Sequence, residues 1–379
     1  MKIIYPYPEE ITFARAREVH TARMCEALAL DGAEVIWLMG NTPGVAAPDV
    51  RRRFGLSDTK KLRLEFGPRY LWLGGRKVST RPRYMGHLRR VLEREKCDVL
   101  YAIHLKLAEE MLSWKVRPPL VFEAHEIFAD AYPEGHRRFA ALAAQEQRVY
   151  PGCDALVATS AHTLESVRHR YGVPERSLIA WNAVAPGEFS GGTDRTHPGT
   201  AVYAGSLIPW KGVGVLLKAW QKLGGDYRLV VVGGRGEEIR PLEKFVHDAG
   251  MRDRVLFMGH RRRAELAFWL SRAEVCVLPN LMEPRSSTYS FPMKLLEYAA
   301  AGKRIVASAI PVVRELEAHF PGMILAEPGN AADLAEKLKS AFETPAPSIR
   351  PDLAPFFWET RAQKMKKWMQ AWLTEKQTG

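Results

Sequence analysis

Apolar residues along the chain fall in short runs, which alternate with longer stretches where apolar positions recur at helical spacing. The runs are rich in Val, Ile and Leu without a polar residue at every second position, which is typical of parallel strands covered on both faces. In the first half this pattern predicts strands at 2–5, 34–38, 98–103, 120–123, 155–159 and 177–181, with helices near 15–31, 82–94, 105–114, 136–149 and 161–171.

The alternation begins again in the second half. It predicts strands at 201–204, 228–232, 254–258, 275–278, 304–307 and 323–326, with helices near 213–222, 238–249, 262–272, 292–301, 311–318 and 330–343. Residues 185–200 are rich in Gly, Pro, Ser and Thr, which favours a hinge. We therefore expect an α/β protein of two doubly wound parallel-sheet, Rossmann-like domains, 1–184 and 201–355, facing across a cleft.

Size and cysteine usage narrow the class of protein. A chain of 379 residues is too long for one core. The four cysteines are scattered without CxxC spacing, which argues against a zinc site or a disulfide framework and fits a reducing cytoplasm. The first residues are too quickly broken by proline for a signal peptide, and no run of about 18 apolar residues suggests a membrane span. We expect a cytoplasmic protein.

The positive charge is concentrated in one segment. The formal net charge is +12, and residues 51–96 alone hold 15 Lys or Arg against 4 Asp or Glu. A solvated basic loop is one interpretation, and an anionic acceptor or the inner face of an anionic membrane is another. Nucleic acid is a third, but no nucleic-acid-binding motif accompanies the charge, so we expect none to bind.

The segment 289–302 carries the sharpest pattern. Ser290 is a favourable N-cap and Pro292 is tolerated in a first helical turn, so we expect a helix to begin here and to end at Gly302. Free amides at the start of such a helix attract phosphate.

Three residues of this helix could share one ligand. Met293 and Lys294 would present their amides to a phosphate, and Glu297 lies about one turn further on the same face, within reach of a ribose. An ordinary capped helix with an exposed Glu297 is the alternative.

Other strand ends in the second half also carry chemistry. Gly205 allows close approach of the backbone, and Lys211 beside a helix start is suited to a diphosphate. Gly233 lies in a Gly-Gly-Arg-Gly turn whose spacing is wrong for a dinucleotide fingerprint. Gly259 and His260 follow the next strand and could present backbone groups to a flat base.

In the first half, His125 and His104 each end a predicted strand. Such a histidine can hydrogen-bond a sugar hydroxyl or assist movement of charge, although a buried structural histidine is the usual alternative. Arg15, Arg17 and His20 lie near the start of the chain and are candidates for the acceptor side. No metalloprotease, esterase or paired-carboxylate motif is present.

With these motifs in place, the chain resembles the GT-B fold glycosyltransferases of the large retaining group called family 4, or glycosyl transferases group 1. The resemblance covers nearly the whole chain and is most specific after residue 150. It is carried by the segments 157–161, 181–184, 204–212, 255–259 and 290–302, and by Phe-Trp-Glu at 357–359. It implies that a terminal helix at 356–375 packs back on the first domain.

The resemblance also implies roles for single residues. Glu297 would hold the donor ribose, Lys211 the diphosphate, and His125 the donor sugar near the reacting centre. Phe291, Pro292 and Met293 would offer backbone contacts to the diphosphate and the sugar.

Three positions depart from the family pattern. Tyr289 stands where the first glutamate of a pair is expected, Ser206 stands where an arginine accompanies the lysine, and residues 5–11 replace a glycine-rich loop. Loss of the arginine removes a phosphate contact worth about 1.5–3 kcal/mol.

The function expected from these observations is retaining transfer of a sugar from a nucleoside-diphosphate donor to a glycan or lipid-linked saccharide of cell-surface polysaccharide synthesis. No cofactor and no metal are expected. An epimerase or inverting transferase of the same fold is one alternative, and a non-catalytic sugar-nucleotide or membrane-surface binding protein is another.

Overall fold

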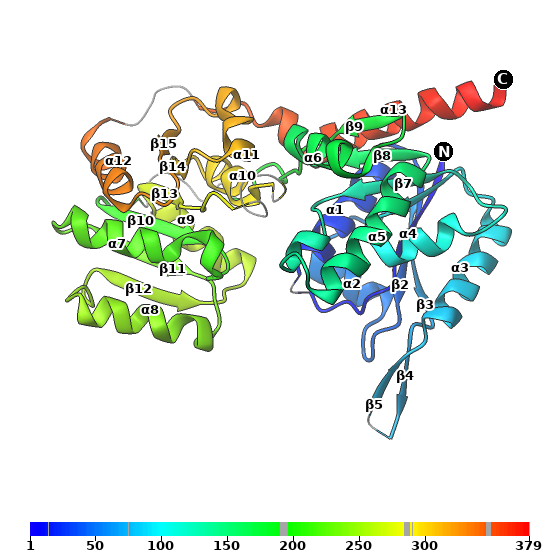
Figure 1. The fold of residues 1–379 in the computed structure, drawn as a ribbon, viewed down its shortest axis with the longest axis horizontal. Coiled ribbons are helices and arrows are strands. Elements are labelled where there is room, and N and C mark those ends of the chain that lie inside the picture. Colours follow the sequence, from blue (N-terminus) through cyan, green and yellow to red (C-terminus); the bar gives the residue numbers. More distant parts are fainter. Residues whose placement is uncertain are drawn as a thin grey trace. The chain divides into compact units, whose positions relative to one another are not determined.

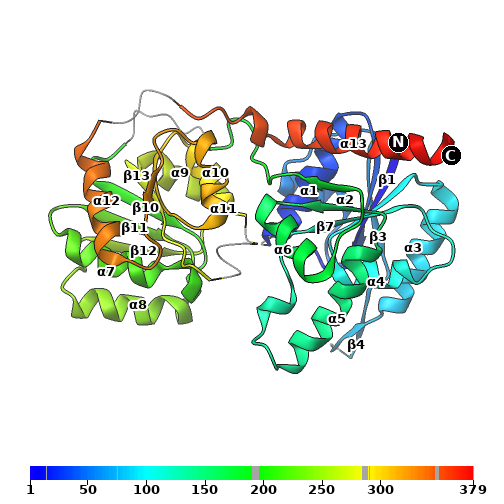
Figure 2. The same ribbon diagram turned by 45° about the horizontal axis from the view of Figure 1, so that its top comes forward.

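The computed structural model describes residues 1–13, 15–74, 76–189, 196–283, 289, 291–345 and 350–378. The chain forms two compact units: unit 1 is Met1–Asn182 with Trp358–Gly379, and unit 2 is Ala183–Phe357. Each unit has its own parallel sheet with helices on both faces (Figures 1 and 2). In the part of the chain that the structure describes, none of the helices combines the length and apolar character that a membrane span requires.

The sheet of unit 1 has seven strands in the order β3-β2-β1-β6-β7-β8-β9. All neighbours in it are parallel. Its strands are β1 (Lys2–Tyr7), β2 (Glu34–Gly40), β3 (Leu62–Gly67), β6 (Val99–Ala102), β7 (Leu120–Ala124), β8 (Ala155–Ala158) and β9 (Ser177–Ile179). Tyr5, Trp37 and Tyr101 are fully buried in its core.

The helices of unit 1 include one from the far end of the chain. They are α1 (Ala16–Leu30), α2 (Ala47–Phe54), α3 (Arg81–Glu95), α4 (Leu105–Leu112), α5 (Arg137–Gly152), α6 (Ala161–Tyr171) and α13 (Trp358–Thr378). α13 packs against α1, and both views show it running along this unit (Figures 1 and 2). The chain therefore returns to its first unit at its C-terminal end.

The interpretation of residues 51–96 as a basic loop is wrong. The segment completes α2 and forms β3, an antiparallel hairpin of β4 (Tyr70–Leu73) and β5 (Arg76–Ser79), and α3. β3 is the edge strand of the sheet, and its apolar residues alternate with Arg63 and Glu65, which form ion pairs with residues of α3. The hairpin projects beyond the sheet of unit 1 (Figure 1).

The sheet of unit 2 has six parallel strands in the order β12-β11-β10-β13-β14-β15. These are β10 (Thr200–Ala204), β11 (Arg228–Val232), β12 (Val255–Gly259), β13 (Val275–Leu278), β14 (Arg304–Ser308) and β15 (Ile324–Ala326). The order reverses between β10 and β13, so the loops after these two central strands lie at the point where ligands bind in doubly wound sheets.

The helices of unit 2 are α7 (Val213–Leu223), α8 (Gly236–Asp248), α9 (Arg263–Arg272), α10 (Met293–Ala300), α11 (Pro311–Arg314) and α12 (Ala331–Glu343). α7 and α12 pack on each other, with Trp220 and Leu338 fully buried in the core that they share with the sheet. The helix expected at 311–318 is shorter than predicted, because α11 ends at Arg314 and a separate 3₁₀ turn follows at Glu317–His319.

Candidate active site

In unit 2 the loops that follow β10 and β13 are joined directly. The Leu281 N–H donates to the Trp210 carbonyl at 2.9 Å. Gly212 has a φ of +73°, and a Cβ atom placed on it would lie 1.8 Å from the Pro279 carbonyl oxygen. Only glycine fits there, and this close approach fixes the position of the neighbouring Lys211.

Lys211 carries its positive charge at a position where burial and a neighbouring lysine disfavour the charged form. Its ammonium lies 4.3 Å from the centroid of the Trp210 ring. Burial and the nearby positive charge of Lys294 lower the pKa of Lys211 from 10.5 to about 8. Among the described residues no carboxylate forms an ion pair with Lys211. The surroundings of this lysine therefore favour an anion from outside the chain.

The start of α10 differs from the prediction. The helix begins at Met293, after Pro292, whose φ of −79° and ψ of 73° are those of an inverse γ-turn rather than a helix. The Met293 N–H donates to the Phe291 carbonyl at 2.9 Å, so this amide is not free for a phosphate. Ser290, predicted as the N-cap, lies outside the described residues.

Glu297 is not the exposed glutamate of the alternative interpretation. Its side chain is buried and accepts a hydrogen bond at 2.5 Å from the ammonium of Lys294. The next residue, Tyr298, is fully buried, and its hydroxyl accepts a hydrogen bond at 2.8 Å from the Ala204 N–H at the end of β10. Tyr298 thus holds α10 beside the Lys211 loop. Sequence reasoning missed this role because a tyrosine among apolar helix positions carries no distinguishing pattern.

The remaining donor-side candidates lie at the same edge of the sheet or beside α10. Gly205 follows β10, and its N–H donates to the Val232 carbonyl at 2.9 Å. Gly233 follows β11 and its N–H donates to the Gly259 carbonyl at 2.8 Å, so the backbone groups joined here are not open to a base. Ser206 and His260 are exposed, whereas Tyr289, Phe291 and Pro292 are buried.

In unit 1 three side chains converge on one carboxylate. Glu123 in β7 is fully buried, and its Oε1 atom lies 2.6 Å from Arg361, 3.0 Å from His125 Nε2 and 3.1 Å from His20 Nε2. The Tyr101 hydroxyl donates to the other carboxylate oxygen. Burial alone would raise the pKa of Glu123, but Arg361 and the two imidazoles hold it well below its usual value.

Arg361 comes from α13 and was not among the predicted site residues. It is buried, and it also donates to the Trp181 carbonyl at 2.8 Å. Trp358 of the same helix packs its ring edge-on against His20, with centroids 5.3 Å apart. Burial lowers the pKa of His20 to about 4, so this imidazole is neutral at pH 7. The C-terminal helix therefore builds part of the surroundings of His125.

The same cluster has donor atoms close enough to hold a metal ion. One atom from each of His20, Glu123 and His125 lies within 4.8 Å of the others. However, the Glu123 oxygen nearest the imidazoles already binds the guanidinium of Arg361, and a second cation on this oxygen would be repelled. These residues fit the positioning of His125 better than a metal site.

The other acceptor-side candidates gather around Glu9, which follows β1. Arg15 lies 2.6 Å and Arg17 3.5 Å from the Glu9 carboxylate, and His104 Nδ1 lies 3.7 Å from it. Burial, with the charges of Arg17 and Arg15, lowers the pKa of His104 to about 3. His104 is therefore a neutral imidazole that can exchange hydrogen bonds with a sugar.

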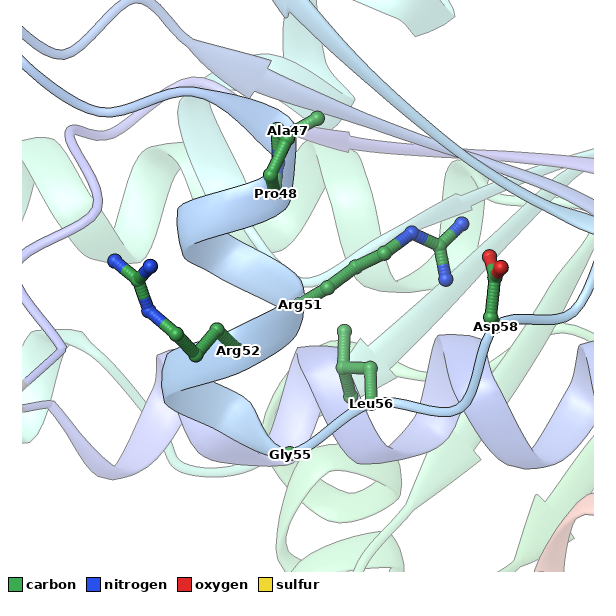
Figure 3. A pocket seen from close by; sticks show the side chains of 7 residues that line it. All are labelled: Ala47, Pro48, Arg51, Arg52, Gly55, Leu56 and Asp58. Carbon is green, nitrogen blue, oxygen red and sulfur yellow. The ribbon is translucent and has the colours of Figure 1, made fainter.

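A hollow of about 490 Å³ beside α2 contains part of the basic segment (Figure 3). Arg51 donates to the Ser57 and Leu62 carbonyls at 2.7 and 2.6 Å. Arg52 points to the other side of the helix and pairs with Asp49 at 2.7 Å. Since both guanidinium groups already have partners, this hollow offers little to an anion.

Comparison with known proteins finds a family match for each of the two units. The family model described as Glycosyltransferase Family 4 matches residues 18–187, which lie almost entirely in unit 1. The model described as Glycosyl transferases group 1 matches residues 198–344 of unit 2. A D-inositol 3-phosphate glycosyltransferase of Xylanimonas cellulosilytica is 30% identical over 232 residues, which are 52% of this chain and 54% of the relative. The chain thus spans about half the length of the curated relatives it matches.

Solved structures match over nearly the full length. Sucrose-phosphate synthase from Thermosynechococcus elongatus superposes with a TM-score of 0.72 at 16% identity, covering 99% of this chain and 100% of that one. The Anabaena protein HepE in complex with UDP and glucose superposes with a TM-score of 0.70 at 17% identity, covering 98% and 100%. These likenesses establish the fold. Because the two family models account for the two units in turn, the chain belongs to the glycosyltransferases of family 4 and group 1, with the GT-B fold.

Proposed function

We propose that this chain transfers a sugar from a nucleoside-diphosphate donor to an acceptor, with retention at the anomeric carbon, and that unit 2 holds the donor. The observation that carries the proposal is the environment of Lys211. A half-buried ammonium with a pKa lowered to about 8, beside a second lysine, is stabilised by an incoming diphosphate.

The start of α10 supports the same placement of the donor. Lys294 pairs with Glu297 in the structure. A diphosphate carries more negative charge than one carboxylate, so it would attract Lys294 and leave Glu297 to accept hydrogen bonds from the ribose hydroxyls. Lys211, Lys294 and Glu297 would then contact one donor molecule.

The chemistry follows from where charge develops. As the bond to the sugar breaks, negative charge grows on the departing diphosphate, and the ammonium groups of Lys211 and Lys294 stabilise it. The acceptor hydroxyl forms the new bond to the anomeric carbon and gives its proton to a phosphate oxygen of the leaving group. We assign His125, held by Glu123, the role of orienting the transferred sugar. The proposal needs neither a metal nor a cofactor.

For the acceptor we propose a glycan or lipid-linked saccharide of cell-surface polysaccharide synthesis, used by a cytoplasmic enzyme that can bind the inner face of a membrane. The Xylanimonas relative is named for D-inositol 3-phosphate, which is an anionic compound and agrees with a basic acceptor side. The exposed cations Lys60, Arg76, Arg83 and Arg90 support membrane binding. Salt-sensitive binding to anionic vesicles, absent with neutral ones, is the expected result; equal binding to both would contradict it.

Nucleotide release from a panel of UDP-, GDP- and ADP-sugars tests the donor part of the proposal. Lys211→Ala and Glu297→Ala should each reduce release and donor binding strongly, whereas Lys218→Ala, at an exposed position of α7, should leave both unchanged. Transfer that survives both site variants would refute the assigned roles. Nucleotide binding without transfer to any acceptor would favour the non-catalytic alternative, and the anomeric configuration of the product tests retention.

A further inference from the structure

Unit 1 contains a second hollow that the donor site does not use. It has a volume of about 670 Å³, within the usual range for small-molecule sites, and lies between the residues after β1, the base of the β4–β5 hairpin and the start of α4. His104 contributes to its wall, at the carboxyl end of β6. The hollow therefore opens at the sheet edge that also presents His125.

The lining of this hollow is strongly basic. It includes five cationic side chains, Arg15, Arg69, Lys77, Arg81 and Lys106.

Only some of these charges are balanced within the chain. Glu9 pairs with Arg15, Glu10 pairs with Lys77, and Glu110 lies 3.3 Å from Arg81. Among the described residues, Arg69 and Lys106 form no ion pair with a carboxylate. Two positive charges are thus left for a ligand.

Arg69 is held in place rather than extended into solvent. Its backbone N–H donates to Asn41 Oδ1 at 2.7 Å, and its carbonyl accepts from the Thr80 N–H at 2.7 Å. One guanidinium nitrogen donates to Ser79 Oγ, and the group stacks 4.7 Å from the centroid of the Tyr70 ring. Its Nε atom is buried and has no hydrogen-bond partner in the described part of the chain. A fixed guanidinium with an unused donor is suited to an oxyanion.

Four apolar side chains also line the hollow. Leu105 and Leu107 are buried, and Phe128 and Leu142 are half-buried. A ligand here would place a negative group against Arg69 and Lys106 and an uncharged part against these side chains.

We infer that this hollow binds the acceptor through a phosphate group, with Arg69 and Lys106 as its specificity-determining residues. A phosphate matches the two unbalanced cations in charge, and it can belong either to a sugar phosphate or to the diphosphate of a lipid carrier. The inference deepens the proposed function and depends on it only in calling the occupant the acceptor.

Calorimetric titration of the full-length protein tests this inference with four probes: glucose 6-phosphate, farnesyl diphosphate, inorganic phosphate and glucose. The titrations are made in the wild type and in Lys211→Met, because the donor site can also bind phosphate. We expect binding of a phosphorylated probe in both proteins and none of glucose. Tighter binding of glucose 6-phosphate would identify a sugar phosphate, and tighter binding of farnesyl diphosphate a lipid carrier.

Two single variants and a matched control locate the site. Arg69→Ala and Lys106→Ala should each weaken the phosphorylated probe about 10- to 100-fold, as expected for loss of one charged hydrogen bond. Lys106 is exposed, so its removal does not endanger the fold even if Arg69→Ala loosens the hairpin. Arg52→Ala removes one charge outside the hollow and should leave binding of the phosphorylated probe unchanged.

The inference is overturned if no phosphorylated probe binds in the Lys211→Met background, or if the control weakens binding as much as the site variants. Titration of Arg69→Ala with nucleotide sugars separates failure of the phosphate-binding inference from failure of the proposed function. If nucleotide sugars bind normally while the probes do not, the donor site stands and the phosphate hollow is refuted. If the probes bind and no nucleotide sugar does, the phosphate site in unit 1 stands and the proposed donor site in unit 2 is refuted.

Discussion

Replacing Lys211 by Met should stabilise the folded protein while removing its affinity for a donor. Methionine keeps the apolar stem of the lysine and removes only the charge. The pKa of Lys211 falls from 10.5 to about 8 on folding, and each tenfold change in an ionisation constant corresponds to about 1.4 kcal/mol. Holding the ammonium charged at pH 7 therefore costs roughly 3 kcal/mol. The contact with the Trp210 ring offsets about 0.5–1 kcal/mol of this.

The effect must depend on pH in one direction. Between about pH 8 and 10.5 the unfolded chain binds the lysine proton and the folded chain does not, so wild-type stability gains from Lys211 as the pH rises through this window. The methionine variant lacks this gain. The difference in unfolding free energy between variant and wild type should be about 2–3 kcal/mol below pH 8 and should shrink towards zero near pH 10.5.

Amide hydrogen exchange of α7 and the unit 2 strands is the suitable assay, because a chain of two units need not unfold in one transition. Lys218→Met, at an exposed position of the same helix α7, is the control and should leave the exchange rates unchanged. A destabilised Lys211→Met, or a difference that does not vary with pH, would refute the reasoning. In either case the charge of Lys211 would be satisfied inside the protein, and the case for an external anion would be lost.

Three further predictions concern Lys211, Gly212 and Arg361. Nucleoside-diphosphate affinity should fall by up to tenfold per pH unit above about pH 8, because the diphosphate binds the charged form of Lys211; a flat calorimetric pH profile would contradict this. Gly212→Ala should destabilise unit 2 by well over 1 kcal/mol and weaken donor binding, since its Cβ would overlap the Pro279 carbonyl, and unchanged thermal unfolding would argue against it. Arg361→Met should cost about 3–5 kcal/mol in unfolding free energy by leaving Glu123 buried without its cation; a loss below 1 kcal/mol would be inconsistent with this pairing.

The central strands could be predicted from the sequence because they are buried on both faces and read as unbroken apolar runs. β1, β11 and β13 are of this kind, and β11 and β13 match the predicted bounds. β3 was not predicted, because this edge strand alternates apolar and charged residues and resembles part of a basic loop. Local pattern is therefore sufficient where a strand reads as an apolar run, which includes the edge strands β9, β12 and β15, and insufficient at β3, where charged residues interrupt the run.

In the candidate site, too, the sequence predicted some features and missed others. The sequence predicted Lys211 and Glu297 as donor-site residues through a motif. In the structure both side chains are at least partly buried, and both lie near Lys294. It placed the helix start at Pro292, one residue too early, because proline is equally compatible with a first helical turn and with the γ-turn observed here. The choice between these two conformations depends on packing around the proline, which no local pattern records.

Glu123 shows where local reasoning could have gone further. A carboxylate in the middle of the buried run Leu-Val-Phe-Glu-Ala cannot stay ionised without a cation beside it, so the strand itself predicts a partner. It does not say which of the 55 Lys or Arg supplies the charge. The partner is Arg361, 238 residues later on α13, where it resembles any charged residue of an amphipathic helix. Since the same carboxylate contacts His125, the C-terminal helix is part of the support for this imidazole, and removing it should disturb His125 as well as the stability of unit 1.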